Sequence, residues 1–247
     1  MPPNILDTMQ SRVSFEICAV NIQSAHAAQA AGGHRIELCS ALDTGGVTPS
    51  PGLIRHAVVQ LSIPVNVLIR PREGDFCFSD AEMDVMLDDI RFCREAGVNG
   101  VVVGALDSGG QLDLDALRAF KSAAGDMELV CHRAFDFTPD PFAALEQLIE
   151  LGFARVLSSG QADNAYKGRF TLGKLVTAAA DRISIMPGSG IDASNIAEIM
   201  KETGASEFHF TGKRKVSSPG QPIAGLDAAY WVSDPDLIKA AINAASG

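Results

Sequence analysis

Short apolar segments alternate with amphipathic ones along most of this chain, beginning at Phe15. The apolar segments are rich in β-branched residues, which is typical of buried parallel strands. We predict eight strands, at residues 15–20, 35–39, 65–70, 100–103, 128–132, 155–157, 184–186 and 207–210. Each is followed by a segment with the periodicity of an amphipathic helix.

These helices are predicted at residues 24–31, 51–60, 81–96, 114–124, 141–151, 172–180, 194–202 and 235–245. Several end in glycine just before the next strand, as at Gly97, Gly152 and Gly204, because glycine adopts the left-handed conformation that ends a helix. Eight strand–helix units predict an α/β fold, a TIM (β/α)8 barrel in a single domain. We place the barrel domain at residues 13–247, after an N-terminal extension of residues 1–12. The alternative, a doubly wound open sheet, needs a glycine-rich phosphate-binding segment after its first strand, and this sequence has none there.

The amino-acid composition and net charge limit the classes of partner and the cellular location that we expect for this protein. Of the 247 residues, 47% are hydrophobic and 20% charged, which is typical of globular proteins. The net charge of −10 gives no basic field for nucleic acid or an anionic membrane, so neither is expected as a partner. The first residues have neither the basic start nor the apolar core of a signal peptide, and we expect a cytoplasmic protein.

A Glu-x-Cys pattern occurs twice, at Glu16–Cys18 in FEICAV and at Glu37–Cys39 in HRIELCS. Side chains alternate along a strand, so each glutamate shares a face with its cysteine. Neighbouring strands lie about 5 Å apart, and two such thiols suit Cu(I), which prefers soft ligands. Cys18 and Cys39 are therefore candidate metal ligands, with Cys77 as a possible third. Alternatively, they are small core residues, as we expect for Cys93 and Cys131.

Polar residues at the predicted strand ends indicate a second kind of site, because TIM barrels carry their sites there. The candidates for acid–base catalysis are Glu16, Glu37, His132 and Asp136. The candidates for anion binding are Arg70, Arg72, Ser158, Gly160, Gly188, Gly190 and His209. Taken alone, each of these residues could have a structural role instead of a functional one: Arg70 could simply pair with Glu37, and His132 could be a core histidine. Together they favour an enzyme acting on a small phosphorylated or carboxylated metabolite as the alternative function.

Eight segments, from FEICAV through IELCSALDTGGVTPSPG, IRPREGDF and CHRAFD to FHFTGK, resemble the CutC family in the same order. The resemblance implies a cytoplasmic TIM barrel, a homodimer or homotetramer, and a copper homeostasis role through Cu(I) bound by the cysteines at positions 18 and 39. It implies no established enzymatic activity. The chain departs from the family after His209, where TGKRKVSSPGQP replaces a more usual Ser-Ala-Arg run. A purely structural or partner-binding barrel is the third hypothesis.

Overall fold

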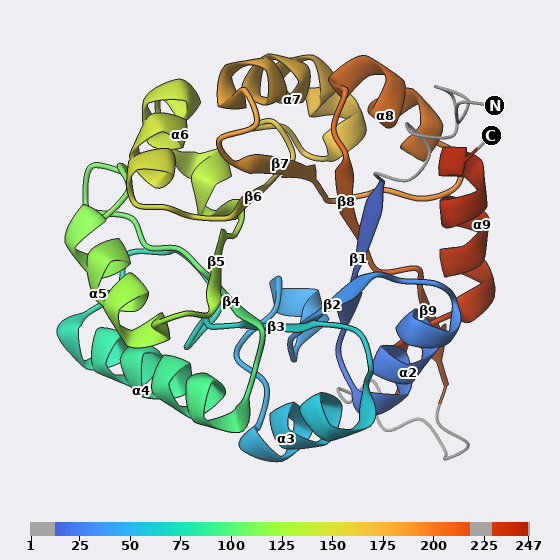
Figure 1. The fold of residues 1–247 in the computed structure, drawn as a ribbon, viewed down its shortest axis with the longest axis horizontal. Coiled ribbons are helices and arrows are strands. Elements are labelled where there is room, and N and C mark those ends of the chain that lie inside the picture. The colour runs from blue at the N-terminus through green and yellow to red at the C-terminus, as the bar shows by residue number, and fades with distance from the viewer. Residues whose placement is uncertain (1–12, 218–228, 247) are drawn as a thin grey trace, which may run out of the picture.

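The computed structural model describes residues 13–217 and 229–246. Eight parallel strands form a ring at the centre of the molecule, with helices outside it (Figure 1). The strands are β1 (Ser14–Ala19), β2 (Arg35–Leu38), β3 (Val65–Leu68), β4 (Gly100–Val103), β5 (Glu128–Cys131), β6 (Arg155–Ser158), β7 (Ser184–Pro187) and β8 (Glu207–Phe210). They pair in the order β8-β1-β2-β3-β4-β5-β6-β7, which confirms the predicted TIM barrel in a nearly closed form. The predicted extension of residues 1–12 lies outside the described residues.

The outer layer follows the predicted strand–helix alternation. The helices are α2 (Ile22–Ala30), α3 (Pro51–Gln60), α4 (Asp80–Ala96), α5 (Leu114–Ala124), α6 (Pro141–Glu150), α7 (Ala165–Ala179), α8 (Ile196–Thr203) and α9 (Pro235–Ser246). Short 3₁₀ helices lie at Leu42–Thr44 and Arg133–Phe137. Gly97 and Gly204 end α4 and α8 with φ values of 80° and 66°, as the sequence predicts.

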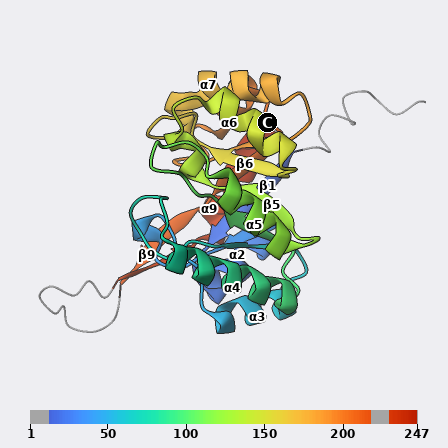
Figure 2. The same ribbon diagram turned by 90° about the vertical axis from the view of Figure 1, so that its left-hand side faces the viewer.

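The largest differences from the sequence prediction are one helix start and one pair of strands. Helix α7 begins at Ala165 rather than at residue 172, because Gly168 hides the helical pattern. A Cβ atom at Gly168 would lie 1.8 Å from the carbonyl oxygen of Ser159, so the helix needs glycine there to pack on the loop after β6. The second difference is an antiparallel hairpin of β9 (Lys213–Val216) and β10 (Tyr230–Ser233), which the sequence analysis did not predict. Strand β10 packs against α2, and β9 extends from the left edge of the barrel in Figure 2.

Alternation along the strands divides the buried residues into two apolar clusters. The larger lies between strands and helices and includes Ile17, Ile36, Cys93 and Cys131, which confirms the core placement of these two cysteines. The smaller fills the barrel interior and consists of Cys18, Cys39, Leu68, Val102, Val130, Leu157 and Met186, with Val20 and Leu42 against it. The side chains of Cys18 and Cys39 therefore project into the barrel, as the two Glu-x-Cys patterns predict.

Candidate functional site

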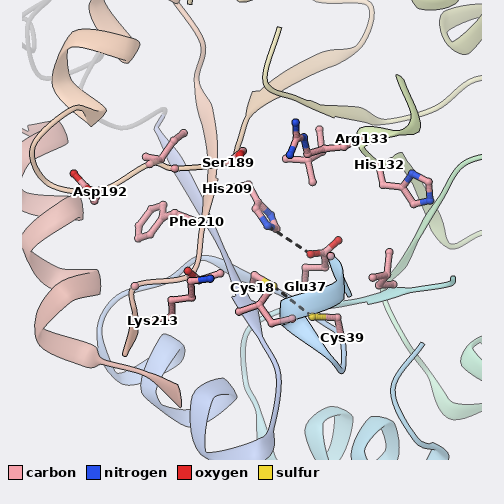
Figure 3. A pocket seen from close by; sticks show the side chains of 18 of the residues that line it. Cys18, Glu37, Cys39, His132, Arg133, Ser189, Asp192, His209, Phe210 and Lys213 are labelled. Carbon is pink, nitrogen blue, oxygen red and sulfur yellow. Dashed lines mark hydrogen bonds and ion pairs between the residues drawn. The ribbon is translucent and has the colours of Figure 1, made fainter. Parts of the chain in front are cut away.

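The register between β1 and β2 brings the two Glu-x-Cys segments together at different heights. Glu16 lies opposite Arg35, and Cys18 lies opposite Glu37. The second segment is thus displaced by two residues toward the carboxyl ends of the strands. The Sγ atoms of Cys18 and Cys39 are 3.5 Å apart, and Figure 3 shows both thiols beside Glu37. Both cysteines are free thiols.

His209 joins this group from β8, which pairs with β1 on its other side. Its Nδ1 is 2.9 Å from Glu16 Oε1, and its Nε2 is 3.5 Å from Glu37 Oε2. One potential ligand atom from each of Cys18, Glu37 and His209 lies within 4.8 Å of the others, and all three residues are buried. His209 was predicted to bind an anion and was not predicted as a candidate metal donor, although β8 and β1 become neighbours whenever an eight-stranded barrel closes.

Burial and pairing shift the protonation of this cluster. Burial would raise the pKa of Glu16, but the hydrogen bond with His209 and the charge of Arg35 outweigh it and lower that pKa to about 2. Burial and the charge of Glu16 raise the pKa of Glu37. The hydrogen bond with Cys39, together with burial, raises the pKa of Cys18 well above its usual value. Burial opposes protonation of His209, yet Glu37, Cys18 and Glu16 raise its pKa. The cluster therefore holds protons that a cation must displace.

A cavity of about 1000 Å³ lies above this cluster, at the carboxyl ends of the strands. Cys18, Glu37, Cys39 and His209 line its floor, and His132 lies on its wall (Figure 3). Arg70 also lines the cavity. The remaining lining includes residues that were not among the predicted catalytic, anion-binding or metal-binding residues, namely Phe76, Arg133, Ser189, Asp192, Phe210, Lys213 and Leu237. Phe76, Arg133 and Ser189 follow predicted strands, so the strand-end rule that found the other candidates applies to them as well.

Glu16 lies below the cavity, in a chain of ion pairs inside the barrel. Arg35 Nε is 2.5 Å from Glu16 Oε2, and Arg35 Nη2 is 2.8 Å from Glu207 Oε2. Arg155 continues the chain, 2.7 Å from Glu207 and 2.5 Å from Glu128. Glu16 is 1% exposed and does not line the cavity. The structure thus places this predicted catalytic residue where it organises the interior and orients His209.

Asp136, Ser158 and Gly160 form a separate cluster that supports the loop after β6. Asp136 accepts hydrogen bonds from the Ser158 hydroxyl, the Ser159 amide and Arg133 Nε. The Ser158 hydroxyl in turn accepts from the Gly160 amide. None of Asp136, Ser158 and Gly160 lines the cavity, so the structure does not bring these predicted catalytic and anion-binding residues to it.

The two predicted arginines differ in position. Arg72 donates from Nε to Glu82 Oε1 at 2.5 Å and from Nη2 to Asp75 Oδ1 at 3.0 Å, and it does not line the cavity. Arg70 lines the cavity and makes no ion pair with Glu37. Exposed Cys77 donates to the Asp107 carbonyl, away from the two buried thiols.

The two glycines predicted to bind an anion after β7 also differ in position, because only one of them lines the cavity. Gly190 lines the cavity with a φ of 68°. Gly188 lies outside the lining and packs so closely on Leu157 that an added Cβ would lie 2.4 Å from that side chain. Gly188 therefore permits close packing of β7 on its neighbour.

The fold and the strand-end cavity define a TIM barrel whose site lies at the carboxyl ends of its strands. A sequence model of the CutC family matches residues 13–214, and the chain belongs to the CutC family. Family protein CutC from Pasteurella multocida (strain Pm70) is 47% identical over 81% of this chain and 82% of its own. Family protein CutC from Mesorhizobium japonicum is 43% identical over 96% of both chains.

Solved structures agree with this assignment. The crystal structure of CutC from Streptococcus agalactiae, named for copper homeostasis, has a TM-score of 0.77 and 35% identity over 81% of this chain and 98% of that chain. Phosphoribosyl anthranilate isomerase from Thermotoga maritima, at 13% identity and a TM-score of 0.57, covers 95% of this chain and 99% of its own and shares the fold alone. In the described residues we find no helix with the length and hydropathy to cross a membrane.

Proposed function

We propose that this protein binds Cu(I) as its cargo in the cytoplasm, through the thiolates of Cys18 and Cys39. The observation that carries the proposal is the 3.5 Å separation of the two sulfur atoms on the cavity floor. Cu(I) prefers thiolate ligands, and the Streptococcus agalactiae relative is named for copper homeostasis. The carboxylate of Glu37 lies beside the thiols and favours a cation there.

The spacing of the sulfur atoms favours a bent site with a third donor. With a metal–sulfur bond of about 2.3 Å, as in zinc thiolates, sulfurs 3.5 Å apart subtend an angle of about 100° at the metal. A linear site would need the sulfurs about 4.6 Å apart. His209 lies close enough to Cys18 to complete a bent site. Zn²⁺ also accepts cysteine, histidine and carboxylate donors, so the identity of the metal has to be tested directly.

The test is competition between the reduced protein and a chromogenic Cu(I) chelator without oxygen. Cys18→Ser and Cys39→Ser should each weaken Cu(I) binding roughly a hundredfold, because each removes one of two thiolates. Cys77→Ser is the matched control, since that thiol is exposed and outside the cavity, and its affinity should equal that of the wild type.

Unchanged Cu(I) affinity in the Cys18→Ser, Cys39→Ser double variant would refute the proposal. Displacement of Cu(I) by equimolar Zn²⁺ would refute the assignment of copper as the cargo. Binding should also release protons, because the pKa of Cys18 lies well above its usual value in the metal-free protein. Proton release is measured by repeating the titration in buffers of different ionisation enthalpy.

A further inference from the structure

The cavity wall beside the cysteines carries a buried guanidinium that forms no ion pair with any carboxylate of the described residues. Arg70 is 5% exposed, and its Nη1 donates to the carbonyls of Thr44 and Gly46 at 3.0 and 2.9 Å. Its Nη2 donates to the Gly74 carbonyl at 2.7 Å, and its Nε has no hydrogen-bond partner in the described part of the chain. These hydrogen-bond partners are all neutral, and the negative charges of Glu73 and Asp75 act on Arg70 without forming an ion pair with it. A buried charge is costly unless it is paired, so Arg70 retains an attraction for an anion.

His132 provides a second unpartnered donor on the same wall. It is 5% exposed, and its Nδ1 accepts from the Ala134 amide at 3.1 Å. The hydrogen of the neutral ring is therefore on Nε2, which has no partner among the described residues. Burial, and then the charge of Arg70, lowers the pKa of His132 to about 3, so the ring remains neutral at physiological pH.

Phe76 packs against both of these side chains. Its ring centroid is 5.0 Å from Arg70 Cζ and 4.9 Å from the centroid of the His132 ring. All three residues line the cavity. The unpartnered nitrogen atoms each expose less than 1 Å², so a ligand oxygen reaches them only when neighbouring side chains move.

The size and lining of the cavity indicate what such a ligand looks like. A volume of about 1000 Å³ is at the upper end of the usual range for small-molecule sites and far exceeds that of an ion. Leu42, Leu157, Ile191, Phe210 and Leu237 give it an apolar lining. These groups suit a compact organic body that carries one anionic head.

We propose that the wall formed by Arg70, Phe76 and His132 binds the anionic oxygen atoms of a small organic ligand, either a carboxylate or a phosphate ester. The ligand's charge compensates that of Arg70, and His132 Nε2–H donates to one of its oxygens. The apolar part of the ligand occupies the cavity toward Phe210 and Leu237. This site goes beyond copper binding and does not depend on it, because none of its donors is a proposed copper ligand.

The test measures binding of benzoate, phenyl phosphate and inorganic phosphate to the metal-free reduced protein by titration calorimetry, with benzamide as the neutral match for benzoate. Benzoate or phenyl phosphate should bind saturably, and at least tenfold more tightly than benzamide. The ratio between the two anions distinguishes a carboxylate site from a phosphate-ester site. Tighter binding of inorganic phosphate than of either aromatic anion would overturn the assignment to an organic ligand.

Matched variants locate the binding. Arg70→Lys should weaken anion binding roughly tenfold, because lysine keeps the charge but not the guanidinium contacts, whereas Arg72→Lys, outside the cavity, should leave it unchanged. His132→Phe should weaken it severalfold, and His132→Gln, which keeps a donor, should weaken it less. The urea unfolding midpoint of each variant is also measured, because Arg70 donates hydrogen bonds to loop carbonyls and its replacement can destabilise the fold. If Arg70→Lys does not fold, the comparison of His132→Phe with His132→Gln tests the proposal.

Three further results would overturn the proposal: no saturable binding of any anion by the wild type, binding of neither aromatic anion more tightly than benzamide, or equal effects of the Gln and Phe variants at position 132. The Cys18→Ser, Cys39→Ser double variant should still bind the anion. That result separates a failure of the copper proposal from a failure of this one.

Discussion

Glu16 and Glu37 occupy the same place in two Glu-x-Cys segments, yet they lie in different parts of the barrel interior. Glu16 contacts Arg35, Asn66 and His209, and its pKa is lowered to about 2. Glu37 lines the cavity and has a raised pKa. The strand register causes the difference, because it moves the second segment two residues toward the cavity. The same residue type therefore serves the stability of the barrel in one segment and borders its site in the other.

The contrast extends to the whole interior. In the lower part, the carboxylates of Glu16 and Glu207 pair with Arg35 and Arg155, and Arg155 also pairs with Glu128, whose side chain is exposed. In the upper part, and among the described residues, Arg70 donates hydrogen bonds only to neutral carbonyls, and His132 Nε2 has no hydrogen-bond partner. Paired buried charges are explained by folding alone, whereas a buried charge without an ion pair at a cavity wall costs stability, which the proposed ligand would offset. The presence or absence of an ion pair therefore distinguishes the charged side chains that stabilise the barrel from those that are candidates for ligand binding.

The largest expected effect comes from neutralising Glu16. Glu16→Gln should lower the free energy of unfolding by about 4 kcal/mol, because it leaves Arg35 and His209 buried without that counter-charge. Glu37→Gln should lower it by less than about 1 kcal/mol, because Glu37 borders the cavity and burial already disfavours its charged form. Urea unfolding of both variants measures the comparison. Equal losses of stability would show that the two segments do not differ as described.

Sequence patterns predicted the barrel well because strand–helix alternation and helix-ending glycines are local signals. They also placed Cys18 and Cys39 on the inner face, since side-chain alternation within a strand is local too. They could not separate Glu16 from Glu37, because that depends on the register between β1 and β2. Arg70 and Arg72 are two residues apart, yet Glu82 and Asp75 hold only Arg72 outside the cavity, a loop geometry that no periodicity encodes. The β9–β10 hairpin was missed because β9 is a charged and mostly exposed KRKV segment without the apolar pattern that marks the barrel strands.

Acid provides a second, somewhat smaller test of the same contrast. Glu16 has a pKa of about 2 in the folded chain against an ordinary value of 4.5, so its carboxylate stabilises the fold above pH 4.5. That contribution, about 3 kcal/mol in total, is lost as the pH falls from 4.5 toward 2, with about 2 kcal/mol gone by about pH 3. The difference in unfolding free energy between the wild type and Glu16→Gln should therefore narrow by about 2 kcal/mol between about pH 5 and about pH 3. Urea titrations across this range measure the gap, and a constant gap would contradict the lowered pKa of Glu16.

The smallest expected effect concerns Glu37 and copper. Glu37→Gln should weaken Cu(I) binding roughly tenfold, because it removes a carboxylate that lies with Cys18 and His209 around the proposed site. The loss should grow as the pH rises, since the raised pKa of Glu37 means that its charge develops only at higher pH than in an ordinary glutamate. Chelator competition at several pH values measures the trend. If the wild type and Glu37→Gln bind Cu(I) with equal affinity at every pH, Glu37 does not influence the metal. Glu37 would then belong with Glu16 among the structural charges, and the two glutamates would not differ in function.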